Sequence, residues 1–184
     1  METIFETILR YDTLIFRAIN NLSNPVLDVL ALFVSLPGEA GAFWISLALI
    51  VLVFGKSEYR IYGLLALVAM FVSDLVIAHT IRVIHFRPRP FIGLEDVHQL
   101  GPAWRGSSFP AAHADSSFAC AFVLGKGLER AKVFLYTFAT LSSLSRIYLG
   151  MHYPSDVIAG ALVGLFSGFL IIRLYGYYIA RRNR

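Results

Sequence analysis

The residues best suited to chemistry lie in two stretches that flank long apolar runs. One stretch, residues 145–156, carries an arginine, a histidine and an aspartate: Arg146, His152 and Asp156. The other, residues 82–90, carries three arginines: Arg82, Arg87 and Arg89. The guanidinium group is always charged and matches the oxygens of a phosphate. A histidine supported by a carboxylate is the usual arrangement of an activated nucleophile or base. The pattern therefore predicts phosphate chemistry.

The composition indicates that a bilayer surrounds much of the chain. Of its 184 residues, 57% are hydrophobic and only 15% are charged, and the mean hydropathy is +0.67. Soluble domains contain about 45–50% apolar and about 25% charged residues. The 16 lysines and arginines are too few and too dispersed for a nucleic-acid surface. We expect one domain over residues 1–184 and no nucleic-acid partner.

Five apolar runs approach the length that a helix needs to cross a bilayer, roughly 20 residues. They lie at about 40–55, 61–81, 113–128, 131–150 and 156–179. Residues 3–36 are ambiguous, because apolar and charged side chains alternate there as in a helix that lies in the membrane interface. The sequence predicts an all-α polytopic membrane bundle of five to six spans, with an N-terminal interfacial helical segment and a core at about residues 26–179.

Loop charges predict the orientation. Basic residues gather at 56–60, 126–132 and 181–184, which alternation of the spans places on one side. The positive-inside rule makes that side cytoplasmic. Segments 82–112 and 146–156 then share the opposite face. The prediction is a multi-pass protein of the cytoplasmic membrane, with a cytoplasmic C-terminus and a site that faces outward.

In chain order, residues 82–90 are the first motif and residues 145–156 are the second. The spacing of the second motif brings three groups together. Pro154 suits the first position of a helix, so Asp156 in the first turn can reach the ring of His152 and fix its tautomer. Arg146 ends the preceding span. Taken singly, Asp156 is explained as a helix cap and Arg146 as an anchor at the membrane surface. Three such groups within eleven residues, on the same face as the first motif, favour a functional site.

A third segment, Pro110-Ala111-Ala112-His113, opens the third predicted span. The free backbone N–H groups at the start of a helix bind phosphate. His113 in that position can donate a proton to a leaving oxygen. Alone, it is better explained as an interfacial histidine bonded to water.

The three segments resemble the type 2 phosphatidic-acid phosphatase superfamily. Its pattern is Lys-x6-Arg-Pro, then Pro-Ser-Gly-His, then Ser-Arg-x5-His-x3-Asp. The resemblance covers about residues 26–179 and implies a phosphohistidine mechanism without a metal or other cofactor. It assigns the nucleophile to His152, its orienting carboxylate to Asp156 and the general acid to His113. It assigns phosphate binding to Arg82, Arg89 and Arg146, with the helix start at Ala111 and Ala112.

Within this superfamily the segments are most similar to bacterial undecaprenyl-diphosphate phosphatases. The substrate expected is a lipid phosphate or diphosphate, with phosphatidylglycerophosphate, phosphatidate and lipid A as alternatives. Two positions depart from the pattern: Arg82 replaces lysine, and Ala111-Ala112 replaces Ser-Gly. Ala111 removes a hydroxyl whose bond to a charged phosphate is worth about 1.5–3 kcal/mol. The missing hydroxyl leaves open a different functional class: a membrane protein that binds phospholipid but is catalytically impaired. No protein partner is predicted.

Other polar residues lie within the apolar runs. Asp74 and His79 are five residues apart on the second run and do not share one face of a helix. We expect a structural partner for Asp74, and leave open whether Asp115 caps its helix or tunes the imidazole of His113. Three glycines follow one another at four-residue spacing in the last run: Gly160, Gly164 and Gly168. This stripe is expected to permit close packing inside the monomer rather than to form a dimer face.

Overall fold

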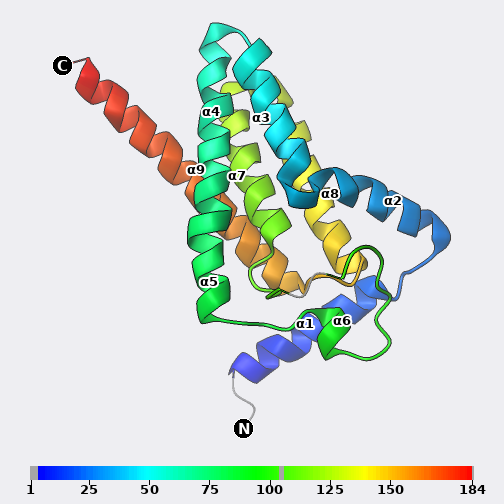
Figure 1. The fold of residues 1–184 in the computed structure, drawn as a ribbon. Coiled ribbons are helices and arrows are strands. Elements are labelled where there is room, and N and C mark those ends of the chain that lie inside the picture. Colours follow the sequence, from blue (N-terminus) through cyan, green and yellow to red (C-terminus); the bar gives the residue numbers. More distant parts are fainter. Residues whose placement is uncertain (1–3, 104–105, 184) are drawn as a thin grey trace.

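In the computed structural model, which describes residues 4–103 and 106–183, all regular structure within those ranges is helical (Figure 1). The α-helices are α1 (Ile4–Asn20), α2 (Pro25–Ser35), α3 (Ala42–Phe54), α4 (Ser57–Phe71), α5 (His79–Ile84), α6 (Pro90–Gly93), α7 (Ala112–Gly127), α8 (Lys132–Tyr148) and α9 (Pro154–Arg182). A π-helical segment, Val72–Ala78, joins α4 to α5. The prediction of an all-α fold is confirmed.

Each of the five predicted apolar runs forms a helix, and these helices stand together as a bundle (Figure 1). The second run is one continuous helix of 28 residues, Ser57–Ile84, and α9 has 29 residues. These two are long and apolar enough to cross a membrane, whereas α2 and α3 are shorter apolar helices. The number of spans, five or six, stays a prediction.

The ambiguous N-terminal segment forms two helices. Helix α1 lies across one end of the bundle, against α8 and α9, and α2 packs on α8 and projects from the side of the bundle (Figure 1). Asn24 separates them: its side chain accepts hydrogen bonds from the N–H groups of Val26 and Leu27, and Pro25 occupies the first turn of α2. In α1, Phe16 is buried while Leu14 and Ile15 are about half exposed. One face of α1 therefore packs on the protein, and another remains apolar and open.

Helix α7 is the centre of the bundle, and it packs most closely on α9. A Cβ atom on Gly160 would lie 2.5 Å from the carbonyl oxygen of Ala111, and one on Gly164 would lie 2.2 Å from that of Asp115. Only glycine allows this approach of the two backbones. The expected packing of the stripe inside the monomer is confirmed, and it brings the start of α9 beside the start of α7.

The outside of the bundle is strongly apolar. Phe54, Ile84 and Val133 expose 78–81% of their surface, and many other large apolar side chains are also exposed. Patches of this extent mark contact with lipid or protein. Both chemical motifs lie at one end of the bundle, and the basic turns 56–60 and 126–132 lie at the other with the C-terminus (Figure 1). The predicted clustering of segments 82–112 and 146–156 is therefore confirmed.

Candidate active site

The end of α8 turns the chain so that His152 is directed back into the protein. Gly150 has φ +77°, a left-handed conformation that favours glycine. The N–H of Met151 bonds to the carbonyl of Arg146, and the N–H of Gly150 bonds to that of Ile147. These two bonds form a Schellman motif, a common way to end a helix. The sequence Gly-Met-His after Arg146 therefore places the imidazole next to the end of the helix that carries the arginine.

The start of α9 places Asp156. Tyr153 is the N-cap residue and Pro154 fills the first turn. Oδ2 of Asp156 accepts a hydrogen bond from the N–H of Tyr153 at 2.8 Å, which is the reach-back contact of a capping box. The same oxygen accepts a bond of 2.5 Å from the hydroxyl of Ser108. Asp156 is therefore a helix cap and also a member of a buried polar network.

Both nitrogens of the His152 ring have defined neighbours. Nδ1 lies 2.9 Å from the carbonyl oxygen of Ser108, and 3.8 Å from Oδ2 of Asp156. A carbonyl oxygen can only accept, so Nδ1 carries the proton of the neutral ring. The lone pair of Nε2 then points to NH1 of Arg89, 3.1 Å away. The tautomer is fixed through Ser108, which Asp156 holds, rather than by direct close contact with Asp156.

The surroundings of His152 keep its ring neutral. Burial, together with the positive charges of Arg89 and Arg146, lowers its pKa from 6.5 to about 4, although Asp156 acts in the opposite direction. At neutral pH the imidazole is therefore unprotonated at Nε2. This is the state that a nucleophile requires.

Arg89 is a buried cation without a carboxylate partner in the part of the chain that the structure describes. Its Nε donates to the carbonyl of Gly106 at 3.2 Å, and NH1 lies 3.3 Å from the carbonyl of Met151. Burial, together with the charge of Arg146, lowers the pKa of Arg89 to about 10. A desolvated positive charge of this kind is an anion-binding group.

Arg146 is 2% exposed, and its NH1 donates to the hydroxyl of Ser35 at 2.6 Å. Ser35 is the last residue of α2. Nothing in the sequence predicted this contact, because 111 residues separate Ser35 from Arg146. The contact joins the N-terminal helices to the arginine of the second motif.

Arg82 has different surroundings from the other two predicted phosphate ligands. Its NH1 lies 2.9 Å from Oδ1 of Asp74, and its NH2 lies 3.0 Å from Oδ2 of Asp115. Its Nε donates to the carbonyl of Pro110 at 3.3 Å. The expected structural partner of Asp74 is confirmed. Asp115, left open from the sequence, shares that arginine rather than facing the imidazole of His113 as its acceptor.

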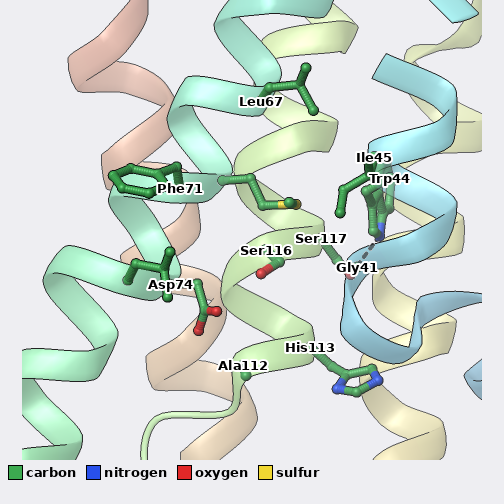
Figure 2. Close-up of a pocket in the computed structure, with 12 residues that line it drawn as sticks. Gly41, Trp44, Ile45, Leu67, Phe71, Asp74, Ala112, His113, Ser116 and Ser117 are labelled. Atoms are coloured by element: carbon green, nitrogen blue, oxygen red, sulfur yellow. Dashed lines mark hydrogen bonds between the residues drawn. The ribbon is translucent and has the colours of Figure 1, made fainter. Parts of the chain in front are cut away.

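The start of α7 brings Ala112 and His113 to the edge of a cavity (Figure 2). Ala111 is the N-cap residue, fully buried and without a side-chain cap bond. Nε2 of His113 has no hydrogen-bond partner in the described residues. The cavity has a volume of about 470 Å³ and is lined by α3, the Ser57–Ile84 helix and α7, mostly with apolar side chains. His113 therefore lies between the polar groups around His152 and the largely apolar cavity inside the bundle.

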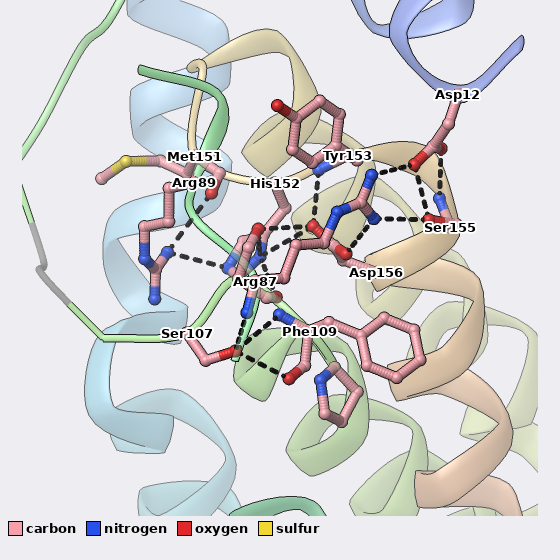
Figure 3. A network of polar contacts seen from close by, with 12 residues as sticks. Asp12, Arg87, Arg89, Ser107, Phe109, Met151, His152, Tyr153, Ser155 and Asp156 are labelled. Atoms are coloured by element: carbon pink, nitrogen blue, oxygen red, sulfur yellow. Dashed lines mark hydrogen bonds and ion pairs between the residues drawn. The ribbon is translucent and has the colours of Figure 1, made fainter. Parts of the chain in front are cut away.

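A network that the sequence did not predict joins α1 to this site (Figure 3). NH1 of Arg87 lies 2.6 Å from Oδ1 of Asp156, and its NH2 lies 2.6 Å from Oδ2 of Asp12. The guanidinium carbon of Arg87 stacks 3.9 Å from the centre of the Tyr153 ring. The crowding of arginines at residues 82–89 was visible in the sequence, but nothing there distinguished Asp12 from the other acidic residues of α1.

The polar groups thus form a buried site at one end of a helical membrane bundle, with the neutral imidazole of His152 next to buried arginines. The family model of the PAP2 superfamily matches residues 60–180. The chain belongs to the PAP2 superfamily and is a membrane phosphatase. The resemblance predicted from the motifs is confirmed.

Relatives and solved structures agree with this assignment. The chain is 33% identical over 161 residues to the undecaprenyl-diphosphatase BcrC of Bacillus subtilis, covering 86% of this chain and 81% of that protein. It is 30% identical to an undecaprenyl-diphosphatase of Sulfolobus acidocaldarius, covering 87% and 76%. The crystal structure of Aquifex aeolicus LpxE superposes with a TM-score of 0.75 at 31% identity, covering 86% of this chain and 93% of that one.

Proposed function

We propose that this protein hydrolyses a lipid phosphate or diphosphate through a phosphohistidine on His152. The carrying observation is the arrangement of His152: its Nδ1 donates to the Ser108 carbonyl, and the lone pair of Nε2 faces the guanidinium of Arg89 at 3.1 Å. A phosphate bound at Arg89 would lie next to the attacking nitrogen. Positioned charge supplies most of the catalysis in phosphoryl transfer.

In the first step, the lone pair of Nε2 attacks phosphorus and the bond from phosphorus to the leaving oxygen breaks. The leaving oxygen takes a proton from His113, whose ring lies at the start of α7. Arg89 and Arg146 stabilise the charge of the transferring group, together with the backbone N–H groups at Ala111 and Ala112. In the second step, water gives a proton back to His113 and attacks phosphorus. The P–N bond breaks, and inorganic phosphate leaves.

The substrate proposed is undecaprenyl diphosphate, which would yield undecaprenyl phosphate and inorganic phosphate. Two relatives with at least 30% identity over most of the chain are named undecaprenyl-diphosphatases. The apolar cavity beside His113 supports a leaving group that continues into lipid. Lipid A is an alternative, because a relative that is 38% identical over 79 residues is named a lipid A 4'-phosphatase. Phosphatidylglycerophosphate and phosphatidate are further alternatives, which the resemblance of the motifs implies.

The deciding experiment measures phosphate release from a panel of these lipids by the detergent-solubilised protein. We expect undecaprenyl diphosphate to give the highest kcat/KM. Protein quenched in alkaline detergent should carry label from ³²P-substrate that is stable to alkali and labile to acid, and His152→Ala should carry none while still binding the lipid. Normal turnover by His152→Ala would exclude the mechanism. Lipid binding without turnover in the native protein would favour the impaired, lipid-binding alternative.

The reaction is proposed to need no metal ion. We expect phosphate release to be unchanged in excess EDTA. Loss of activity that magnesium restores would contradict this proposal.

The site is proposed to face away from the cytoplasm, because the basic turns lie at the opposite end of the bundle. In a Cys120→Ser background, Ala103→Cys should react with an impermeant thiol reagent on intact cells. Asn183→Cys should react only after the membrane is permeabilised. Both positions are exposed on the protein. The reverse labelling would overturn the orientation.

A further inference from the structure

Asp12 is a buried carboxylate on the N-terminal helix, and all its contacts are distant in sequence. It is 5% exposed. Its Oδ1 accepts a hydrogen bond from the N–H of Ser155 at 2.8 Å, and its Oδ2 accepts one from the Ser155 hydroxyl at 2.6 Å. Oδ2 also lies 2.6 Å from NH2 of Arg87. Because burial of a charge is costly unless it is paired, these contacts fix α1 at the site.

Arg87 is shared between two carboxylates. Its NH2 is bonded to Asp12, and its NH1 is bonded to Asp156 at 2.6 Å and to the hydroxyl of Ser155 at 2.8 Å. The guanidinium is a rigid planar fork, and stacking on Tyr153 fixes its plane. The direction of the NH1 arm toward Asp156 is therefore set by what holds the NH2 arm.

The charges of this group explain why the sharing matters. Asp12, Arg87 and Asp156 together carry one net negative charge. If Arg87 were paired with Asp156 alone, it would neutralise the only carboxylate beside His152. When Nε2 of His152 bonds to phosphorus the ring becomes cationic, and a residual negative charge nearby stabilises that state. Because Asp12 also pairs with Arg87, the charge of Asp156 is only partly neutralised, and Asp156 can still stabilise the cationic imidazole.

Asp156 is linked to the imidazole of His152 through Ser108. Its Oδ2 accepts the hydroxyl proton of Ser108, and the carbonyl of Ser108 accepts the Nδ1 proton of His152. The path from α1 to the imidazole therefore runs from Asp12 through Arg87 to Asp156, and then through Ser108, whose hydroxyl bonds to Asp156 and whose carbonyl bonds to His152 (Figure 3).

We propose that Asp12 is a positioning residue for the phosphatase reaction: through Arg87 it sets the orientation and charge of Asp156, and thereby the tautomer of the His152 ring. This inference rests on the proposed function, since it assigns Asp12 a part in that reaction. The N-terminal helix is then a component of the active site rather than only an attachment to the membrane surface.

The test compares Asp12→Asn with the native protein in detergent. We expect kcat to fall by about ten- to a hundredfold, the range that a small displacement of catalytic groups produces. KM should change little, because Arg89 and Arg146 still bind the phosphate. Asp12→Glu should recover part of kcat. The matched control is Thr13→Val, whose hydroxyl bonds only to Leu9 of its own helix; it should retain native kcat.

A second measurement does not depend on turnover. The ¹⁵N NMR spectrum of histidine-labelled native protein at neutral pH should show His152 as one tautomer, protonated at Nδ1. Its signals are assigned by their loss in His152→Asn. Asp12→Asn should show a mixture of tautomers. In addition, Asp12→Asn/Arg87→Gln should lose no more activity than the worse single variant, because both act through one path.

The outcomes are distinct. Native kcat together with an unchanged tautomer in Asp12→Asn overturns the inference, and so does a lower kcat with an unchanged tautomer. If Asp12→Asn does not give folded protein by size exclusion and thermal melting, Asp12→Glu and Ser155→Ala decide, each with a smaller effect of the same sign. If the native protein hydrolyses none of the lipids, the proposed function fails, while the tautomer measurement still decides whether Asp12 acts on His152.

Discussion

Arg82 and Arg89 come from the same segment and resemble one family motif, yet the fold gives them opposite surroundings. Arg82 lies between two carboxylates, Asp74 and Asp115. Arg89 contacts backbone carbonyls and the ring of His152, with no carboxylate on it in the described residues. The comparison teaches that two arginines of one motif can differ in whether protein carboxylates neutralise their charge. Carboxylates neutralise Arg82, so we propose that Arg89, rather than Arg82, is the main phosphate ligand of the two.

The largest effect is expected from Arg89→Gln. It removes the donor that faces Nε2 of His152, and loss of one such donor typically lowers kcat about 10²–10³-fold. Thermal stability should not fall, because the variant removes a buried and uncompensated charge. Steady-state phosphate release and melting in detergent measure the two quantities. Arg89→Lys is the control that keeps the charge but loses the planar fork. Activity near native in Arg89→Gln would remove Arg89 from the phosphate site.

Arg82→Gln is expected to act mainly on stability. It leaves Asp74 and Asp115 facing each other without a counter-charge, and breaking a buried pair in this way costs about 3–5 kcal/mol. Arg82→Lys should be milder. The triple variant Asp74→Asn/Arg82→Gln/Asp115→Asn should recover much of the melting temperature. If Arg82→Gln melts like the native protein but loses as much kcat as Arg89→Gln, then Arg82 binds phosphate directly and the contrast is wrong.

Ala111→Ser is expected to raise kcat several-fold. Ala111 is the N-cap residue of α7 and makes no side-chain cap bond, so a serine hydroxyl is available to the charge-rich transition state. If the hydroxyl instead caps the helix, stability rises by about 1 kcal/mol and kcat does not change. Ala131→Ser, at the N-cap of α8 and at the opposite end of the bundle, is the matched control. A lower rate, or an unchanged rate without a gain in stability, would remove the phosphate role from residues 110–113.

The smallest effect is on the pH dependence of stability. The pKa of His152 is lowered from 6.5 to about 4 in the folded protein, first by burial and then by Arg89 and Arg146. Between these values the unfolded chain binds more protons than the folded one, so stability falls as pH drops from 6.5 toward 4. His152→Asn should show a weaker decline in melting temperature over this range. Equal declines in the two proteins would place the cause elsewhere.

Hydropathy and motif spacing predicted the helices, the end of the bundle that carries the site, and the groups around His152. They could not predict which polar residues of an irregular loop or amphipathic helix would be buried. Asp12 lies 143 residues from Ser155, and its acidic neighbours in α1 look equivalent in one dimension. The acceptor for Nδ1 is a backbone carbonyl, at Ser108, which leaves no trace in residue type. Arg82 was assigned by resemblance, and its second carboxylate, Asp115, comes from a different helix.

The glycine contacts between α7 and α9 have a mechanical consequence. With Gly160 and Gly164 set against the backbone of α7, the two helices can neither slide nor separate without losing contact along their length. The first turn of α7 carries His113, the proposed proton donor, and the first turn of α9 carries Asp156, the proposed support of the nucleophile. If these roles hold, the close backbone packing keeps the two groups at a constant spacing, and we expect any motion that admits a headgroup to come from elements packed less tightly on this pair.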